Sequence, residues 1–188
     1  MSYLKTTTPR LDDEAKGYLK QHELIEDARA RALSYLDAVW HHLAVSLSAH
    51  SSTRRVELLG GARGLEGLRW RGALEGHLCY VELSDMRRWP SMSGVWVGCA
   101  IGADDLEARA LLKRVVSAER ALSLLPEPLR ALTAPLTFEG DTPHTLCLPL
   151  PLNGQPAPEE AQVLRGYALD LWRLIEGGRA PVASLERE

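Results

Sequence analysis

Cysteine is scarce in this sequence, with Cys79, Cys99 and Cys147 the three present among 188 residues. An odd number of cysteines without a CxxC motif argues against a disulfide framework and against a zinc knuckle. Because each cysteine stands beside apolar residues, we expect three buried free thiols.

Long apolar runs are absent as well, since no stretch approaches the 18 or so residues that a membrane-spanning helix needs. The first residues, MSYLKTTTPRLDDE, lack the apolar core of a signal peptide. We therefore expect a cytoplasmic protein that does not enter a membrane. The formal net charge of −3 creates no overall field that would favour nucleic acid or an anionic lipid surface.

Lysine, asparagine and phenylalanine are rare, with four Lys, one Asn and one Phe against 18 Arg. This usage is typical of a GC-rich bacterial genome, so we expect a bacterial protein. Motifs for nucleotide binding and for serine hydrolases are also missing. The segment LGGARGLEG (59–67) has neither the GxGxxG nor the GxxxxGK[ST] spacing, and no GxSxG elbow occurs. We expect a glycine-rich hairpin turn at 59–67 and no cofactor.

One long amphipathic helix is predicted from Thr8 to about Ser48, with Thr8 as its N-cap and Pro9 in its first turn. Tyr18, Ile25, Ala32 and Val39 recur at every seventh position, the period of a helix with one apolar stripe. At 1.5 Å per residue such a helix spans roughly 60 Å. A domain of this size has a radius of gyration of only about 16 Å. The helix therefore carries more apolar length than one small sheet can cover.

Strand signals dominate the middle of the chain and helix signals follow. A hairpin with a turn at Glu75-Gly76 is predicted, with Arg69 and Arg71 on one face beside Cys79 and Val81. In the predicted strand 145–150, Pro149 is compatible only with a strand at the sheet edge or with a position at the strand end. The predicted strands are 54–59, 68–74, 77–83, 95–101, 136–139 and 145–150, and the predicted helices are 104–125 and 158–176.

Consecutive strands followed by helices favour an α+β fold over a doubly wound one. We predict a five- to six-stranded, mostly antiparallel sheet packed with two helices and preceded by the long N-terminal amphipathic helix. Residues 1–50 form that helix, which serves dimerisation or partner binding. Residues 51–178 form the α+β domain, and residues 179–188 form a flexible tail.

Metal chemistry has weak support in the sequence. His41 and His42 point about 100° apart on a helix, and His50 lies two turns beyond His42, so the three do not form an HExxH-like pair of ligands. Glu57, Glu82 and Asp85 lie on or beside strands, as the metal-binding acids of several nucleases do. The lysine of the nuclease pattern is missing, since none occurs between Lys20 and Lys113. We expect no metal site, and a metal-dependent hydrolase or nuclease remains an alternative.

An arginine-rich region with two tryptophans raises a second alternative, a nucleic-acid-binding hairpin. Arginines there could hold phosphates while indoles stack on bases. Acidic residues share the region, so ordinary cross-strand ion pairs would explain it equally well. The residues of this alternative are Arg69, Arg71, Arg87, Arg88 and Trp70.

The favoured function is non-catalytic binding to another protein or to a second copy of this chain, as in an adaptor, chaperone, immunity protein or accessory subunit. Ala32–Leu47 is expected to pack on the sheet, which leaves the preceding half of the helix for a partner. A loop at 85–93 adds apolar side chains suited to recognition. The predicted partner-binding residues are Tyr18, Leu19, Ile25, Met86, Trp89 and Met92.

Overall fold

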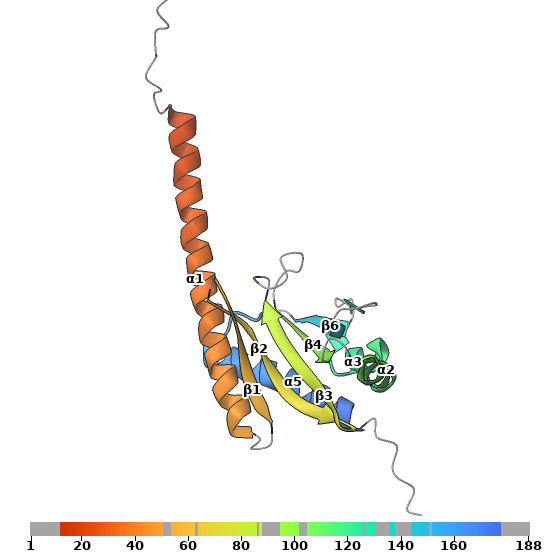
Figure 1. Ribbon diagram of the computed structural model, residues 1–188. Helices are drawn as coiled ribbons and strands as arrows, with labels where there is room; N and C mark the ends of the chain where they lie inside the picture. Colours follow the sequence, from red (N-terminus) through yellow and green to blue (C-terminus); the bar gives the residue numbers. More distant parts are fainter. Residues whose placement is uncertain are drawn as a thin grey trace, which may run out of the picture. The chain divides into compact units, whose positions relative to one another are not determined.

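The computed structural model describes residues 12–50, 54–62, 64–85, 87, 95–101, 105–125, 127–130, 136–137, 144–150 and 152–177 (Figure 1). The chain divides into two units, Met1–Tyr35 and Leu36–Glu188. Helix α1 (Asp13–His50) supplies residues 13–35 to the first unit and residues 36–50 to the second. A search of the described helices finds none with the length and hydropathy needed to span a membrane.

Helix α1 begins at Asp13, so the predicted start at Thr8 is wrong; Thr8 itself lies outside the described residues. Asp12 is the capping residue, because its Oδ1 accepts a hydrogen bond from the Ala15 N–H at 2.8 Å. Aspartate is a better N-cap than threonine, and Asp13 and Glu14 add negative charge to the first turn, where the helix dipole favours it.

The second unit is built on a six-stranded sheet with the order β1-β2-β3-β4-β6-β5, in which all neighbours are antiparallel. The hairpin between β2 and β3 turns at Glu75 and Gly76, which both have positive φ as a two-residue hairpin turn requires. The strands are β1 (Arg55–Gly61), β2 (Gly64–Leu74), β3 (His77–Asp85), β4 (Val95–Ile101), β5 (Leu136–Thr137) and β6 (His144–Leu150).

One local prediction about the strands is wrong. Gly60 and Gly61 belong to β1, which continues past a register irregularity between Leu59 and Gly60. Strand β6 lies between β4 and β5, and Pro149 stands at its end, one of the two positions predicted for it. Pro149 is tolerated because β5 pairs only with Leu146 and Cys147, so in the described part of the sheet Pro149 has a neighbouring strand on one side alone.

The helix predicted over 104–125 is two helices, α2 (Leu106–Val115) and α3 (Ala118–Ser123). The break falls at Val116, which has extended backbone angles, and Ser117 then caps α3 by accepting a hydrogen bond from the Arg120 N–H at 3.2 Å. A β-branched residue followed by a good N-cap is a natural place for one helix to end and another to start. The remaining helices are α4 (Glu127–Arg130) and α5 (Ala157–Gly177).

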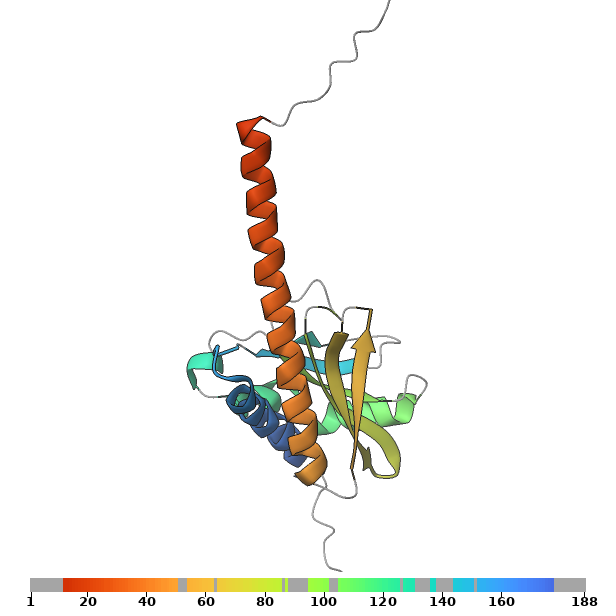
Figure 2. The same cartoon turned by 90° about the vertical axis from the view of Figure 1, so that its left-hand side faces the viewer.

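The core of the second unit lies between α5, the buried end of α1 and one face of the sheet (Figures 1 and 2). Ser46 and His50 of α1 are hydrogen-bonded to Gln162 and Arg165 of α5. Helix α5 packs so closely that a Cβ added at Gly72 of β2 would fall 2.3 Å from the Trp172 ring. The predicted α+β class is confirmed. Of the segment 32–47 that was expected to pack on the sheet, Leu36, Val39, Trp40, Leu43 and Leu47 are buried, whereas Ala32 and Val45 are exposed. The fully buried side chains include Val39, Trp40, Leu43, Leu47, Leu68, Trp70, Leu83, Trp96, Leu148, Leu164 and Trp172.

Candidate functional site

Among the described residues of the first unit, four large apolar side chains are exposed. Tyr18 and Ile25, seven residues apart on one helix face, are 65% and 64% exposed, and Leu19 and Leu24 are more than half exposed. The Tyr18 ring contacts His22, with centroids 6.2 Å apart. These four side chains (Tyr18, Leu19, Leu24 and Ile25) are called the apolar patch of α1. At about 100° per residue, Tyr18 and Ile25 stand at its centre, and Leu19 and Leu24 flank them on opposite sides. Leu24, which directly precedes Ile25 in α1, was not among the predicted partner-binding residues.

The residues predicted for recognition in the loop at 85–93, which are Met86, Trp89 and Met92, lie outside the described residues, and so does Arg88. Asp85 and Arg87 are the described residues of this loop, and the surroundings of Arg87 differ from those expected of a nucleic-acid contact.

Arg87 is the centre of a buried ionic cluster. Its side chain is 3% exposed, and its Nη2 lies 2.7 Å from Oδ2 of the fully buried Asp85. Its Nη1 lies 2.8 Å from Oδ1 of Asp37 on α1, and its Nη2 also donates to the Leu65 carbonyl. The Trp40 indole donates to Asp85 Oδ2 at 2.9 Å. Burial opposes the charge of Arg87, but the hydrogen bonds to Asp85 and Asp37 outweigh it and raise the pKa of the guanidinium.

Arg69 is paired with a buried acid. The hairpin register sets Arg69 opposite Glu82 and Arg71 opposite Tyr80, so the expected neighbours Cys79 and Val81 are wrong by one residue. Arg69 Nε donates to Glu82 Oε2 at 2.7 Å, and Glu82 is completely buried. The Arg69 guanidinium also lies over the Tyr80 ring, 5.4 Å from its centroid. This residue therefore compensates the charge of an interior carboxylate.

Trp70 faces the core and is fully buried. Its ring and that of Trp172 meet edge to face at 6.1 Å, and the Arg54 guanidinium lies 4.9 Å from both centroids. Arg54 also pairs with Glu176 near the end of α5. The indole predicted to stack on bases instead joins β2 to α5 through an aromatic and cation–π cluster.

The described part of the chain contains no group of three His, Cys, Asp or Glu side chains placed so that they could bind one metal ion. Glu82 and Asp85 are hydrogen-bonded to arginines, and Glu57 lies 3.8 Å from Arg71. His41 Nδ1 donates to the Asp37 carbonyl at 2.8 Å, and His50 accepts a hydrogen bond from Arg165.

The three cysteines are buried and free, as predicted. Burial raises the pKa of Cys79 to about 12, and it also raises the pKa of Cys99 and of Cys147. A thiol with so high a pKa carries almost no thiolate near neutral pH, so none of the three is suited to act as a nucleophile.

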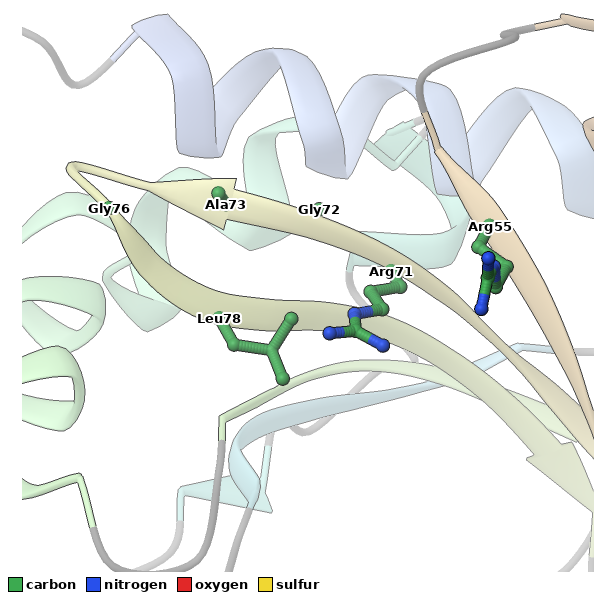
Figure 3. Close-up of a pocket in the computed structure, with 6 residues that line it drawn as sticks. All are labelled: Arg55, Arg71, Gly72, Ala73, Gly76 and Leu78. Atoms are coloured by element: carbon green, nitrogen blue, oxygen red, sulfur yellow. The ribbon is translucent and has the colours of Figure 1, made fainter.

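A surface pocket of about 530 Å³ opens on the β1–β2–β3 face opposite α5. Arg55 and Arg71 are direct partners across the β1–β2 ladder, and both line the pocket. Figure 3 shows Arg71 reaching over β3 toward Leu78. Arg55 was not predicted as a site residue, although the β1–β2 register would have placed it opposite Arg71. The lining residues are Arg55, Arg71, Gly72, Ala73, Gly76 and Leu78.

A histidine–aspartate pair joins the start of β3 to the N-terminus of α2. His77 Nδ1 lies 2.8 Å from Oδ2 of Asp105, the N-cap of α2. The hydrogen bond to Asp105 raises the pKa of His77. The pKa of Asp105 is lowered most by the hydrogen bond from the Ala108 N–H, and it is lowered further by the hydrogen bond with His77.

Comparisons with known proteins do not assign any of these sites a role. No protein-family model matches the chain, and neither the curated proteins nor the solved structures contain a significant match.

Proposed function

We propose that this chain is a non-catalytic protein–protein interaction protein whose partner binds the apolar patch of α1. The observation that carries the proposal is the exposure of Tyr18, Leu19, Leu24 and Ile25, each between 52% and 65%. Large apolar side chains gathered on one helix and left in water are typical of interaction surfaces. Helices of this kind bind either in a groove of another protein or against a second helix.

The energy available from the patch suffices for a specific complex only if both partners bury apolar surface. Full burial of a large apolar side chain is worth about 1.5–3 kcal/mol, and the four side chains are 52–65% exposed, so burying the rest of the patch would contribute roughly 4–7 kcal/mol. Association costs about 4–15 kcal/mol in lost motional freedom. A partner that buries an apolar surface of its own, as a second copy of the chain would, is therefore needed for a favourable balance.

The charged residues around the patch would set the choice of partner. The local ion pairs of the first unit, Lys16 with Asp13 and Arg29 with Glu26, join residues three apart on exposed helix surface. Such exposed pairs contribute little stability and are readily exchanged for pairs with a partner. A second copy of the chain is the partner we test first, since the helix could then bury its patch against itself.

The alternatives fit the described side chains less well. A nucleic-acid-binding hairpin would need Trp70 at the surface and Arg69 and Arg87 available to phosphates, whereas Trp70 is buried and both arginines bind buried acids. A metal-dependent hydrolase would need Glu82 and Asp85 to face an ion, whereas both face guanidinium groups. In a bacterial cytoplasm the proposed function covers an adaptor, chaperone, immunity protein or accessory subunit.

Light scattering coupled to size exclusion at micromolar concentration tests self-association. We expect the full chain to have at least twice the monomer mass and the double variant Tyr18→Ser/Ile25→Ser to have the monomer mass. Val45→Ser is the matched control, because Val45 is 71% exposed on the same helix but belongs to the second unit.

A partner of different sequence is tested by affinity capture from the native host with the same three proteins. If the chain is a monomer, the proposal predicts a partner of different sequence. One captured protein should then bind the unchanged chain and Val45→Ser but not the double variant. If Tyr18→Ser/Ile25→Ser changes neither the mass nor the captured proteins, the apolar patch of α1 is not an interaction surface and the proposal is wrong.

A further inference from the structure

We propose that the pocket formed by Arg55, Arg71 and Leu78 binds the phosphate group of a small phosphate monoester. This inference concerns the second unit and is independent of the partner proposed for α1.

The charged side chains on the sheet face opposite α5 fall into two cross-strand rows that differ in their balance of acidic and basic groups. In one row across the strands Glu57 faces Arg69, and Arg69 faces Glu82, so each arginine has an acid beside it. In the next row Arg55 faces Arg71, and Arg71 faces Tyr80. Like charges directly opposite each other on paired strands are destabilising. The second row therefore holds a positive pair that the sheet itself does not balance.

The acids within reach leave most of this charge uncompensated. Arg71 lies 3.8 Å from Glu57, at the long limit of an ion pair, and both side chains are more than one-third exposed. Among the described residues Arg55 has no ion pair. Among the described residues that line the pocket none is acidic, and the two charged ones, Arg55 and Arg71, both carry guanidinium groups.

The pocket is a hollow open to solvent, and it has the volume of a small-ligand site. Its volume of about 530 Å³ lies within the range of ligand pockets in proteins. Ala73 and Gly76 leave the space open because they have little or no side chain, and Leu78 supplies an apolar wall (Figure 3). Gly72 contributes only its backbone, because the side of its Cα where a Cβ would stand faces Trp172. A ligand that places an anion on the arginines would rest an apolar or aromatic part against Leu78.

The arrangement of donors favours phosphate over carboxylate. One guanidinium fork satisfies both oxygens of a carboxylate, whereas a phosphate monoester offers three terminal oxygens and a charge of about −1.5 to −2 at neutral pH. Side chains opposite each other on paired strands start only about 5 Å apart at Cβ, so two forks can reach one phosphate. The combined charge of +2 on the two arginines matches the charge of a phosphate monoester, and it exceeds the single negative charge of a carboxylate.

Phenyl phosphate is the probe for the test, with benzoate as the carboxylate of matched ring. In two-dimensional amide NMR of the full chain, we expect phenyl phosphate to cause saturable shifts at Gly72, Gly76 and Leu78. Benzoate should bind at least about tenfold more weakly. Arg55→Gln and Arg71→Gln should each weaken phenyl phosphate binding about tenfold or more, as expected for loss of a charge-assisted hydrogen bond.

Two further variants distinguish specific binding at the pocket from an effect of the total protein charge on phosphate binding. Arg173→Gln removes the same charge from an exposed pair on α5 and should change the affinity less than twofold. Glu57→Gln removes the acid that competes for Arg71, so it should tighten binding severalfold, a gain that a misfolded variant would not show.

Three results would overturn the proposal. One is the absence of saturable shifts at the pocket residues, and another is equal affinity for benzoate and phenyl phosphate. The third is displacement of phenyl phosphate by a single-stranded oligonucleotide without terminal phosphates at a lower concentration than by inorganic phosphate, which would make a nucleic-acid backbone the ligand.

Discussion

Replacing Asp85 by asparagine tests the cluster around Arg87. The change keeps the shape of the side chain and an oxygen that can accept from Trp40, but it removes the negative charge beside a guanidinium that is 3% exposed. Removing one partner of a buried ion pair costs about 3–5 kcal/mol. Asp37 still lies 2.8 Å from Arg87 and compensates part of the charge, so we expect about 3 kcal/mol. That is a large share of the 5–15 kcal/mol by which a typical domain is stable.

Urea unfolding followed by near-ultraviolet circular dichroism, which reports the packing of buried tryptophans, measures this loss. With a slope of about 2 kcal/mol per molar, Asp85→Asn should lower the midpoint by about 1.5 M. Asp37→Asn should lose no more than about 1 kcal/mol, because Asp37 is 37% exposed and solvent screens its charge. Asp170→Asn, in an exposed pair with Arg173, is the control and should lose about 0.5 kcal/mol or less.

The double variant Asp85→Asn/Arg87→Gln isolates the cause. It removes the buried charge that Asp85→Asn leaves uncompensated, so it should be at least as stable as the single variant although it changes two residues. If Asp85→Asn costs less than Asp37→Asn, or if the double variant is less stable than Asp85→Asn by a further 3 kcal/mol, the buried charge does not determine the stability of the cluster.

Two other changes test the packing of α5 and the histidine pair. Gly72→Ala should cost about 1–3 kcal/mol in urea unfolding because its methyl group would meet Trp172, whereas Gly166→Ala, with open space around its Cβ on α5, should be neutral or stabilising; equal effects would contradict the close contact. In an NMR pH titration the midpoint of His77 should lie above 6.5, and Asp105→Asn should lower it; a midpoint at or below 6.5 would be inconsistent with the hydrogen bond. Because the folded-state pKa is raised, the stability that His77 contributes is fully present below pH 6.5 and is lost as the pH rises through the raised midpoint.

Local patterns predicted most of the strands, because each strand is defined by nearby residues. Val95–Ile101 is a continuous apolar run, and every residue of that strand is buried. The Glu75-Gly76 turn also fixes the whole β2–β3 register, since pairing Leu74 with His77 sets Arg69 opposite Glu82. Counting outward from the two-residue turn would therefore have predicted Glu82 and Tyr80 as the cross-strand neighbours of Arg69 and Arg71.

The errors concern residues whose surroundings come from distant parts of the chain. Arg87 resembles a surface arginine in the sequence, and nothing near it predicts a contact with Asp37 of α1. Trp70 lies in a strand that alternates between charged and apolar residues, which does not tell whether a helix will cover its apolar face. The apolar patch of α1 was predicted in part from the seven-residue repeat, and its use by a partner remains a prediction.

The contact between Gly72 and Trp172 has an optical consequence. Gly72 lines the arginine pocket, while the side of its Cα where a Cβ would stand is occupied by the Trp172 ring. At this point the pocket and the aromatic core are separated by a single polypeptide backbone. A phosphate held by Arg55 and Arg71 would thus alter the electric field at an indole on the other face of the sheet. Intrinsic tryptophan emission can therefore report occupancy of the pocket without a label, and Trp172→Phe identifies the share of the signal that comes from this ring.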